Sequence, residues 1–237
     1  MGKSLIQQRK GKGSSTFRAP SFRYIGKAKN KTFGKECAGK IVDFINCPGH
    51  SAPLAVVEYD DKELTFEIAA EGLRVGQPIM AAEQTSFNIG DTVPLKNIPE
   101  GTEIYNIESK PGDGGKFVRA AGTFAKVVSK IKNQVIVLLP SNKQKEFFEG
   151  CRATIGVIAG SGRKEKPFVK AGNKYHAMKA KNKMYPNVAG SSMNACNHPF
   201  GNTRSSRKSK ARPAPRHAPP GRKVGMIRPS RSGRTKK

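Results

Sequence analysis

Cys196 and His198 are two residues apart in the sequence NACNHPFG, where a thiol and an imidazole could form a nucleophile and its general base. A working pair also needs a fold that fixes the base and a third group that orients it. The segment lies in a long region that is rich in Lys, Arg, Gly and Pro and poor in apolar residues. No scaffold is expected there, so the sequence disfavours a hydrolase.

Residues 111–117, with the sequence PGDGGKF, are the second candidate for chemistry. A phosphate-binding P-loop needs Gly six residues before its Lys and Ser or Thr directly after it, but Lys110 and Phe117 occupy these positions. What remains is a glycine-rich loop whose backbone N–H groups could approach a phosphate. Contact with a phosphate backbone is favoured over a plain turn, and both interpretations stay open.

The four cysteines are Cys37, Cys47, Cys151 and Cys196. They are widely separated in the sequence, and no two of them form a C-x-x-C motif. With no apolar signal peptide at the N-terminus, they are interpreted as reduced thiols of an intracellular protein, buried or half-buried. Zinc bound by Cys196 and His198 together with Cys37, Cys47 or His50 is the alternative, but none of these pairs has zinc-finger spacing. The sequence therefore predicts neither a metal nor a cofactor.

Net charge is the strongest physical signal in the sequence. Lys and Arg number 44 against 17 acidic residues, which gives +27 and an isoelectric point near 10.3. A compact free protein with this excess would repel itself, so a polyanionic partner is expected, either nucleic acid or an anionic membrane. No run approaches the roughly 18 apolar residues of a membrane span, which disfavours a membrane partner.

The charge is unevenly distributed along the chain. The net charge is +10 over residues 1–40, −8 over 41–110, +5 over 111–160 and +20 over 161–237. If the partner is a nucleic acid, the acidic residues of 41–110 are expected to face away from phosphate or toward basic neighbours.

Between residues 37 and 160 the apolar pattern predicts short strands separated by turns. The expected strands are 40–45, 54–59, 64–68, 103–107, 125–131, 135–139 and 153–158, with a hairpin turn at 60–62. No segment of 12 or more residues keeps a helical period. The fold class is therefore mainly β, with two small barrels that divide near residues 83–88.

Residues 1–36 and 161–237 are expected to be disordered when the protein is free, because their apolar residues are too sparse to offset the entropy of ordering. Solubilising spacers are one interpretation. Isolated aromatic and apolar residues favour another: Phe17, Phe22, Tyr24, Phe33, Phe168, Tyr175, Met178, Met184, Tyr185 and Phe200. Such side chains can stack on unpaired RNA bases while Lys and Arg neutralise phosphates, so extensions that thread into folded RNA are favoured.

Seven segments together resemble the universal large-subunit ribosomal protein L2 family in its archaeal and eukaryotic form. They are QRKGKG at 8–13, FRAPS at 17–21, PGDGGKFVRAAGT at 111–123, CRATIG at 151–156, KPFVKAG at 166–172, MNACNHPFG at 193–201 and APPGRKVG at 218–225. The resemblance covers nearly the whole chain. The sequence departs from the family pattern at Ala189, where Arg is usual, and at residues 202–206, where glycines and histidines are usual.

The resemblance implies four parts: a basic N-terminal extension (1–36), an OB-fold-like barrel (37–84), an SH3-like barrel (85–160) and a basic C-terminal extension (161–237), with both extensions becoming ordered on RNA. It also implies a non-enzymatic, structural constituent of the large ribosomal subunit in the cytoplasm. Its expected partners are large-subunit rRNA and neighbouring ribosomal proteins, with tRNA and small-subunit elements as further candidates at the subunit interface. It would help to organise the peptidyl-transferase region, tRNA placement and subunit association, with the His198 loop approaching that region.

The predicted RNA contacts are basic residues of the extensions and of the second barrel, together with the polar residues of the His198 loop. They are Arg9, Lys10, Lys12, Arg18, Arg23, Lys27, Lys116, Arg119, Arg152, Arg163, Lys164, Lys166, Lys170, Lys174, Lys179, Lys181, Lys183, Asn194, Asn197, His198, Arg204, Arg207, Arg222 and Lys223. A histone-like protein that compacts DNA is the rival from another class, since basic tails would serve it equally well. It would need neither two barrels nor interleaved aromatic residues.

Overall fold

The computed structural model describes residues 2–31, 36–83, 85–202 and 213–229 of the chain. The chain divides into two compact units. Residues 21–167 form the strand unit, and residues 1–20 together with 168–237 form the arm unit.

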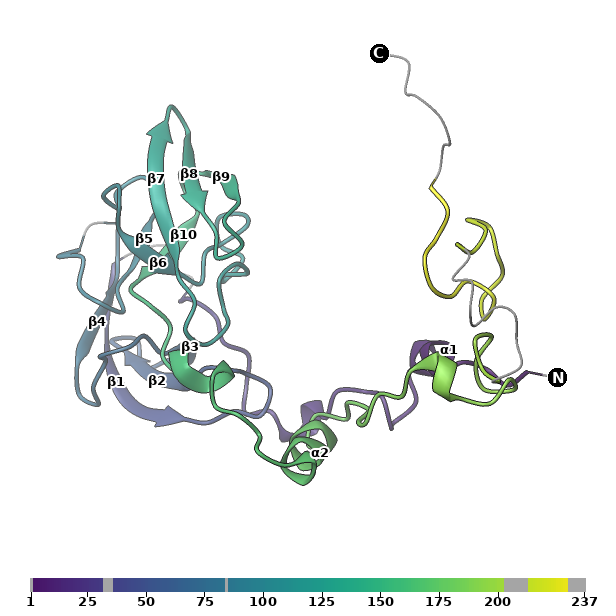
Figure 1. Cartoon of the computed structure of the whole chain (residues 1–237). Helices are drawn as coiled ribbons and strands as arrows, with labels where there is room; N and C mark the ends of the chain where they lie inside the picture. Colours follow the sequence, from purple (N-terminus) through teal and green to yellow (C-terminus); the bar gives the residue numbers. More distant parts are fainter. Residues whose placement is uncertain (1, 32–35, 84, 203–212, 230–237) are drawn as a thin grey trace, which may run out of the picture. The chain divides into compact units, whose positions relative to one another are not determined.

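Ten strands of the strand unit pair into one sheet, so the protein is mainly β (Figure 1). Their bounds are β1 Cys37–Ile45, β2 Leu54–Tyr59, β3 Leu64–Ile68, β4 Pro78–Ala81, β5 Thr92–Pro94, β6 Glu103–Tyr105, β7 Ala125–Ile131, β8 Gln134–Leu138, β9 Gln144–Phe148 and β10 Arg152–Ile155. The order across the sheet is β3-β2-β1-β4-β5-β10-β6-β7-β8-β9. The first four strands therefore lie at one end of the sheet and the last six at the other, joined by the parallel pairing of Ala81 with Thr92.

Most of the predicted strands are confirmed. The ranges 54–59, 64–68 and 125–131 coincide with β2, β3 and β7, and the other four overlap β1, β6, β8 and β10 with shifted ends. The predicted hairpin turn is confirmed by the Lys62 N–H, which donates to the Tyr59 carbonyl at 2.7 Å. Strands β4, β5 and β9 were not predicted because they are short or carry proline and charge in place of an alternating apolar pattern.

Each end of the sheet has its own apolar core, and a third core joins them. Val93, Ile104 and Val137 belong to the core of the β5–β10 half, and Ile41 and Val57 to the core of the β1–β4 half. The third core contains buried side chains from both halves, and within it the Tyr105 hydroxyl donates to the Ile68 carbonyl at 2.9 Å. The two halves are therefore packed as one body.

Bulges bend two of the longest strands. The pairing register shifts between Ile41 and Asp43 in β1 and between Val127 and Ser129 in β7. A bulge increases local twist and bends the strand, which the closure of a small barrel requires. The assignment of the two halves to an OB-fold and an SH3-like barrel, and the four-part division of the chain, remain predictions.

The structure places part of the predicted N-terminal extension in the strand unit. Residues 21–31 belong there, beginning with the 3₁₀ turn η1, Ser21–Arg23. Ala28 and Asn30 are buried whereas Lys27 and Lys29, which precede them, are exposed, so small buried residues alternate with lysines. The Lys29 N–H donates to the Phe66 carbonyl of the edge strand β3 at 2.9 Å. This segment therefore covers a sheet edge that would otherwise be open to pairing.

The arm unit has little core of its own. It contains the helices α1 Ile6–Gly11 and α2 Ala171–Lys179 and the 3₁₀ turn η3 Gly190–Ser192. Among the arm-unit residues that the structure describes, only Leu5, Pro20, Gly201 and Ala214 are buried. Neither α1 nor α2 has a buried residue, which explains why no apolar stripe in the sequence predicted them.

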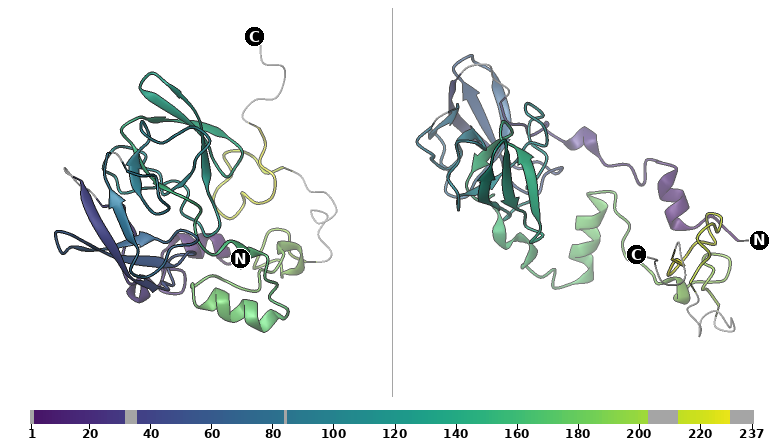
Figure 2. Two further views of the ribbon diagram at one scale, coloured as in Figure 1. Left: turned by 90° about the vertical axis from the view of Figure 1, so that its left-hand side faces the viewer. Right: turned by 90° about the horizontal axis from the view of Figure 1, so that it is seen from above.

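Described N-terminal and C-terminal segments lie side by side in the arm unit, as Figure 2 shows for the purple residues near α1 and the yellow residues of the C-terminal part. The Lys3 N–H donates to the Cys196 carbonyl at 2.8 Å. The Asn182 side-chain amide donates to the carbonyls of Ser15 and Arg18 at 3.3 and 2.9 Å. Polar contacts, rather than buried area, therefore hold the described arms together.

Candidate nucleic-acid interface

Positive charge is concentrated in the arm unit. Residues 1–20 contain 5 basic residues and residues 168–237 contain 18, and neither range contains Asp or Glu. The strand unit holds the remaining 21 basic residues and all 17 acidic ones. The arm unit therefore carries +23 of the net +27 on a framework with few buried residues, which makes it the main candidate surface for a polyanion.

Short helices and turns space the basic side chains of the arm unit. Arg9 and Lys10 lie in the last turn of α1, where positive charge stabilises the carbonyl end of a helix. Lys179 lies likewise at the end of α2, and the Lys174 ammonium sits 5.4 Å from the centre of the Tyr185 ring. The remaining basic residues among the predicted contacts of this unit that the structure describes are exposed: Lys12, Arg18, Lys170, Lys181, Lys183, Arg222 and Lys223. Arg204 and Arg207 lie outside the described residues.

The His198 loop is held together by its own backbone. The Asn194 carbonyl accepts N–H bonds from Asn197 and His198 at 2.9 and 3.2 Å. Gly190 lies under the His198 ring, where a Cβ would clash with the imidazole. A loop with this many internal contacts can present its side chains in a defined direction without a surrounding core.

One tautomer of His198 fits this loop. The Phe200 N–H donates to His198 Nδ1 at 3.0 Å, which requires the proton of a neutral imidazole to sit on Nε2. The Cys196 thiol donates to the Asn197 side-chain oxygen at 3.7 Å rather than to the imidazole. These bonds leave Nε2–H as a hydrogen-bond donor, and they do not join the Cys196 thiol to the imidazole.

In the strand unit, the glycine-rich loop is built around carboxylates. Glu108, which is 1% exposed, accepts N–H bonds from Gly112 and Arg152 on Oε2 at 3.1 and 3.0 Å and from Gly114 on Oε1 at 3.2 Å. Asp113 Oδ1 accepts the Gly115 N–H at 3.1 Å. The loop's amides thus bind the protein's own carboxylates, which favours the turn over a phosphate cradle. A phosphate near this loop would meet the exposed Lys116 side chain instead.

The electrostatics of Asp113 follow from the same bonds. Burial acts to raise the pKa of Asp113, but the N–H groups of Gly115, Ser109 and Lys110, together with the nearby Lys116 ammonium, lower it overall. The carboxylate therefore stays ionised and keeps the loop in its bonded form.

Two of the predicted RNA-contacting arginines are also internal ties. Arg119 donates to the carbonyls of Gly115 and Ala28 at 2.9 and 2.6 Å, and Arg152 donates to the Lys31 carbonyl at 3.0 Å. Burial lowers the pKa of the Arg119 guanidinium, as expected for a cation taken out of water. Both side chains therefore hold residues 28–31 in place. This role could not be predicted from local sequence because the bonded residues are 91 and 121 positions apart.

A buried polar cluster fixes the same segment. Asn30 donates to the Asn106 carbonyl at 3.2 Å, and its side-chain oxygen accepts from the Asn106 amide. The Lys31 ammonium pairs with Asp61 at 2.5 Å and with Glu63. Burial acts to lower the pKa of Lys31, but the bonds to Asp61 and Glu63 raise it overall. Lys31 is therefore already neutralised, whereas Lys27 and Lys29 point outward; Lys29 is a candidate RNA contact that the sequence analysis missed.

The acidic residues occupy two kinds of site. Asp61 and Glu63 face a basic neighbour, as expected, and Glu67, Asp91 and Glu108 are buried inside the strand unit. Burial raises the pKa of Glu67 to about 7, opposed by the Tyr59 hydroxyl, which donates to it at 2.6 Å. These carboxylates serve the fold because they accept hydrogen bonds from groups that would otherwise be unsatisfied.

The other predicted contacts of the strand unit lie at its surface. Arg23 sits 5.3 Å from the Phe22 ring centre, Arg163 and Lys164 lie in the 3₁₀ turn η2, Ser161–Lys164, and Lys166 follows it. All four are exposed. The structure thus places the predicted contacts in two sets, one on each unit.

None of the four cysteines, all of which the structure describes, forms a disulfide, and one departs from prediction in its exposure. Cys47 and Cys151 are buried and Cys37 is half-buried, but Cys196 is exposed because its loop belongs to the core-poor arm unit. Burial raises the pKa of Cys151 to about 11. Within the described ranges, no cluster of three or more His, Cys, Asp or Glu residues could hold a metal ion. In the same part of the chain, no helix has the length and apolar character needed to cross a membrane.

Comparisons with known proteins cover both units. A family model described as "Ribosomal Proteins L2, RNA binding N-terminal domain" matches residues 2–81, and one described as "Ribosomal Proteins L2, C-terminal domain" matches residues 88–218. The large ribosomal subunit protein uL2 of Archaeoglobus fulgidus is 49% identical over 234 residues, 98% of this chain and 99% of the relative. The uL2 proteins of Haloarcula marismortui and Methanosphaera stadtmanae are 47% and 44% identical, each over 99% of this chain and over 98% and 99% of the relatives.

Proposed function

Since the chain belongs to the ribosomal protein L2 family, we propose that it is a structural component of the large ribosomal subunit in the cytoplasm and binds large-subunit rRNA mainly through its arm unit. Neighbouring ribosomal proteins are its other partners, and it is not an enzyme. The observation that carries the proposal is the segregation of charge: 23 basic residues and no acidic one occupy a unit with only four buried residues among those described.

The two units contribute to RNA binding in different ways: the arm unit attracts phosphates, and the strand unit provides a rigid surface. Each arm cation that meets a phosphate releases condensed counterions, which gives favourable and strongly salt-dependent attraction. Part of this gain is offset by the entropy lost when segments without a core become ordered. The strand unit has three packed cores and supplies a rigid docking surface, with Lys27, Lys29 and Lys116 directed outward.

The His198 loop helps to organise the peptidyl-transferase region without taking part in the chemistry. Support comes from the Phe200 N–H bond to Nδ1, which leaves Nε2–H as a hydrogen-bond donor toward RNA. Through the same region the protein assists tRNA placement and the association of the subunits, where tRNA and small-subunit elements are further partners.

A sucrose-gradient experiment with tagged protein tests this function. The chain should sediment with the large subunit, and purified protein should bind large-subunit rRNA in the presence of excess duplex DNA, because 2′-hydroxyl groups and RNA shape are absent from DNA. Equal competition by duplex DNA, with no large-subunit association, would favour the histone-like alternative.

A further inference from the structure

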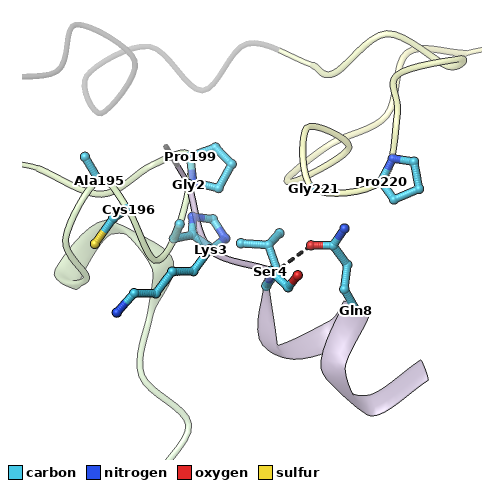
Figure 3. Close-up of a pocket in the computed structure, with 11 residues that line it drawn as sticks. Gly2, Lys3, Ser4, Gln8, Ala195, Cys196, Pro199, Pro220 and Gly221 are labelled. Atoms are coloured by element: carbon cyan, nitrogen blue, oxygen red, sulfur yellow. Dashed lines mark hydrogen bonds between the residues drawn. The ribbon is translucent and has the colours of Figure 1, made fainter. Parts of the chain in front are cut away.

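A cavity of about 300 Å³ lies in the arm unit between its described N-terminal and C-terminal segments (Figure 3). It is lined by residues 2–5 and Gln8, by the segment around Cys196 and by Pro220 and Gly221. The Lys3 N–H bond to the Cys196 carbonyl joins the first two walls, and Gly221 lies against the Gln8 amide. The pocket therefore needs both ends of the chain.

The lining combines flat apolar surfaces with oriented polar groups. Pro199, Pro220 and Leu5 supply the apolar part. Gln8 Oε1 accepts the Leu5 N–H at 2.8 Å, the dashed bond in Figure 3, and this bond fixes the side chain so that its amide NH₂ remains as a donor. His198 also lines the pocket and has its Nε2–H to offer.

Size and charge limit what can enter. A volume near 300 Å³ is at the small end of the range for ligand pockets, so it suits a single ring system and excludes a helix or a peptide strand. The arm unit has no acidic residue and Lys3 is in the lining, so a ring that carries a phosphate is not repelled. The Gln8 NH₂ that remains can donate to a ring nitrogen or carbonyl acceptor on a base edge.

We propose that this pocket receives one base of the rRNA that is turned out of its helix, held by the Gln8 amide and the His198 Nε2–H between apolar ring surfaces. The proposal rests on the rRNA binding proposed above and adds to it a specific base-reading site. The N-terminal residues 2–8 thereby form one wall of the site that contains His198.

The test uses full-length protein bound to large-subunit rRNA, with chemical probing of the Watson–Crick edges of the bases and a filter-binding measurement of Kd. Gln8→Glu keeps the oxygen that accepts the Leu5 N–H, since Glu also serves in a capping box, but removes the NH₂ donor. Gln7→Glu is the matched control, because Gln7 is exposed in the same helix and the charge change is identical. Ala195→Leu adds bulk from the segment around Cys196.

One base that wild type and Gln7→Glu protect should become reactive with Gln8→Glu, and Kd should rise about tenfold, as expected for loss of one base-edge contact. Ala195→Leu should expose the same base. Unchanged protection in both variants, or exposure of different bases by the two, would overturn the pocket while leaving rRNA binding intact. Failure of the wild-type protein to bind rRNA would overturn the proposed function and the pocket together.

Discussion

Replacement of Glu108 by Gln should loosen the glycine-rich loop at Gly114 and destabilise the strand unit. The Glu108 carboxylate receives three backbone N–H bonds, two on Oε2 and one on Oε1, from Gly112, Arg152 and Gly114. Gln retains one oxygen and places a second donor where the other oxygen was. The amide will turn so that its oxygen keeps the two-bond position, which leaves the Gly114 N–H facing an NH₂ group.

The cost of Glu108→Gln can be worked from these bonds. Loss of one hydrogen bond to a charged group costs roughly 1.5 to 3 kcal/mol, and the two retained bonds lose about half their strength when the acceptor becomes neutral. The neutral amide avoids part of the desolvation cost of a buried charge. The free energy of unfolding should therefore fall by roughly 2 to 4 kcal/mol, which is a large part of the total stability of about 5 to 15 kcal/mol that a domain has.

Urea unfolding of the full-length protein measures this change. The chain has no Trp, so tyrosine fluorescence follows the transition, and Tyr105 is buried between the two halves of the strand unit. Glu146→Gln on the exposed face of β9 is the control and should change stability by less than about 0.5 kcal/mol. If Glu108→Gln matched that control, the carboxylate would not be what holds the loop.

Three further predictions concern single side chains. Burial raises the pKa of Glu67 from 4.5 to about 7, so the folded state binds the Glu67 proton more tightly than the unfolded state. The free energy of unfolding of the wild type, relative to that of Glu67→Gln, should therefore fall by roughly 3 kcal/mol between pH 4 and 8. If urea unfolding showed the same pH dependence of stability for both proteins, this prediction would be wrong. Gly115→Ala should lower the free energy of unfolding by roughly 2 to 4 kcal/mol in the same assay, because φ is +90° and a Cβ would clash with Asn106. Gly112→Ala, where φ is +81° and no atom lies near the new Cβ, should lower it by only about 1 to 2 kcal/mol. Ribosomes that carry Cys196→Ala should assemble and make peptide normally, whereas ribosomes that carry His198→Ala should assemble but make peptide more slowly in a translation assay. Slow synthesis with Cys196→Ala and normal synthesis with His198→Ala would support chemistry at Cys196.

The sequence was sufficient to predict strands and turns whose structure depends on residues close together in the chain. The β2–β3 hairpin was predicted with its bounds because residues 54–59 are a short apolar run, residues 64–68 place apolar side chains at every second position, and residues 60–62 form the turn. The insertion of β10 between β5 and β6 was not predictable, since no local pattern specifies pairing between residues about 60 positions apart. Strand β9 was missed because its polar and charged residues form no alternating apolar pattern, so its pairing with β8 defines it rather than its side chains.

In the candidate interface, too, features set by composition were predictable and features set by long-range contacts were not. The charge excess of the arms is a property of composition and was evident from the sequence, together with the loop around His198. The bonds of Arg119 to Ala28 and of Asn30 to Asn106 depend on tertiary placement, so the sequence assigned Arg119 only to RNA. The alternation of Gly26, Ala28 and Asn30 with lysines was a usable sign that residues 26–30 pack against a sheet edge.

The salt dependence of rRNA binding tests the role of the arm unit most directly. Full-length protein is compared with residues 21–167, and log Kd is plotted against log salt concentration for each. If about eight of the 23 arm cations meet phosphates, the two slopes should differ by about 6, because each contact contributes roughly 0.7 to 0.9. Equal slopes for the two proteins would show that the arms do not bind the RNA.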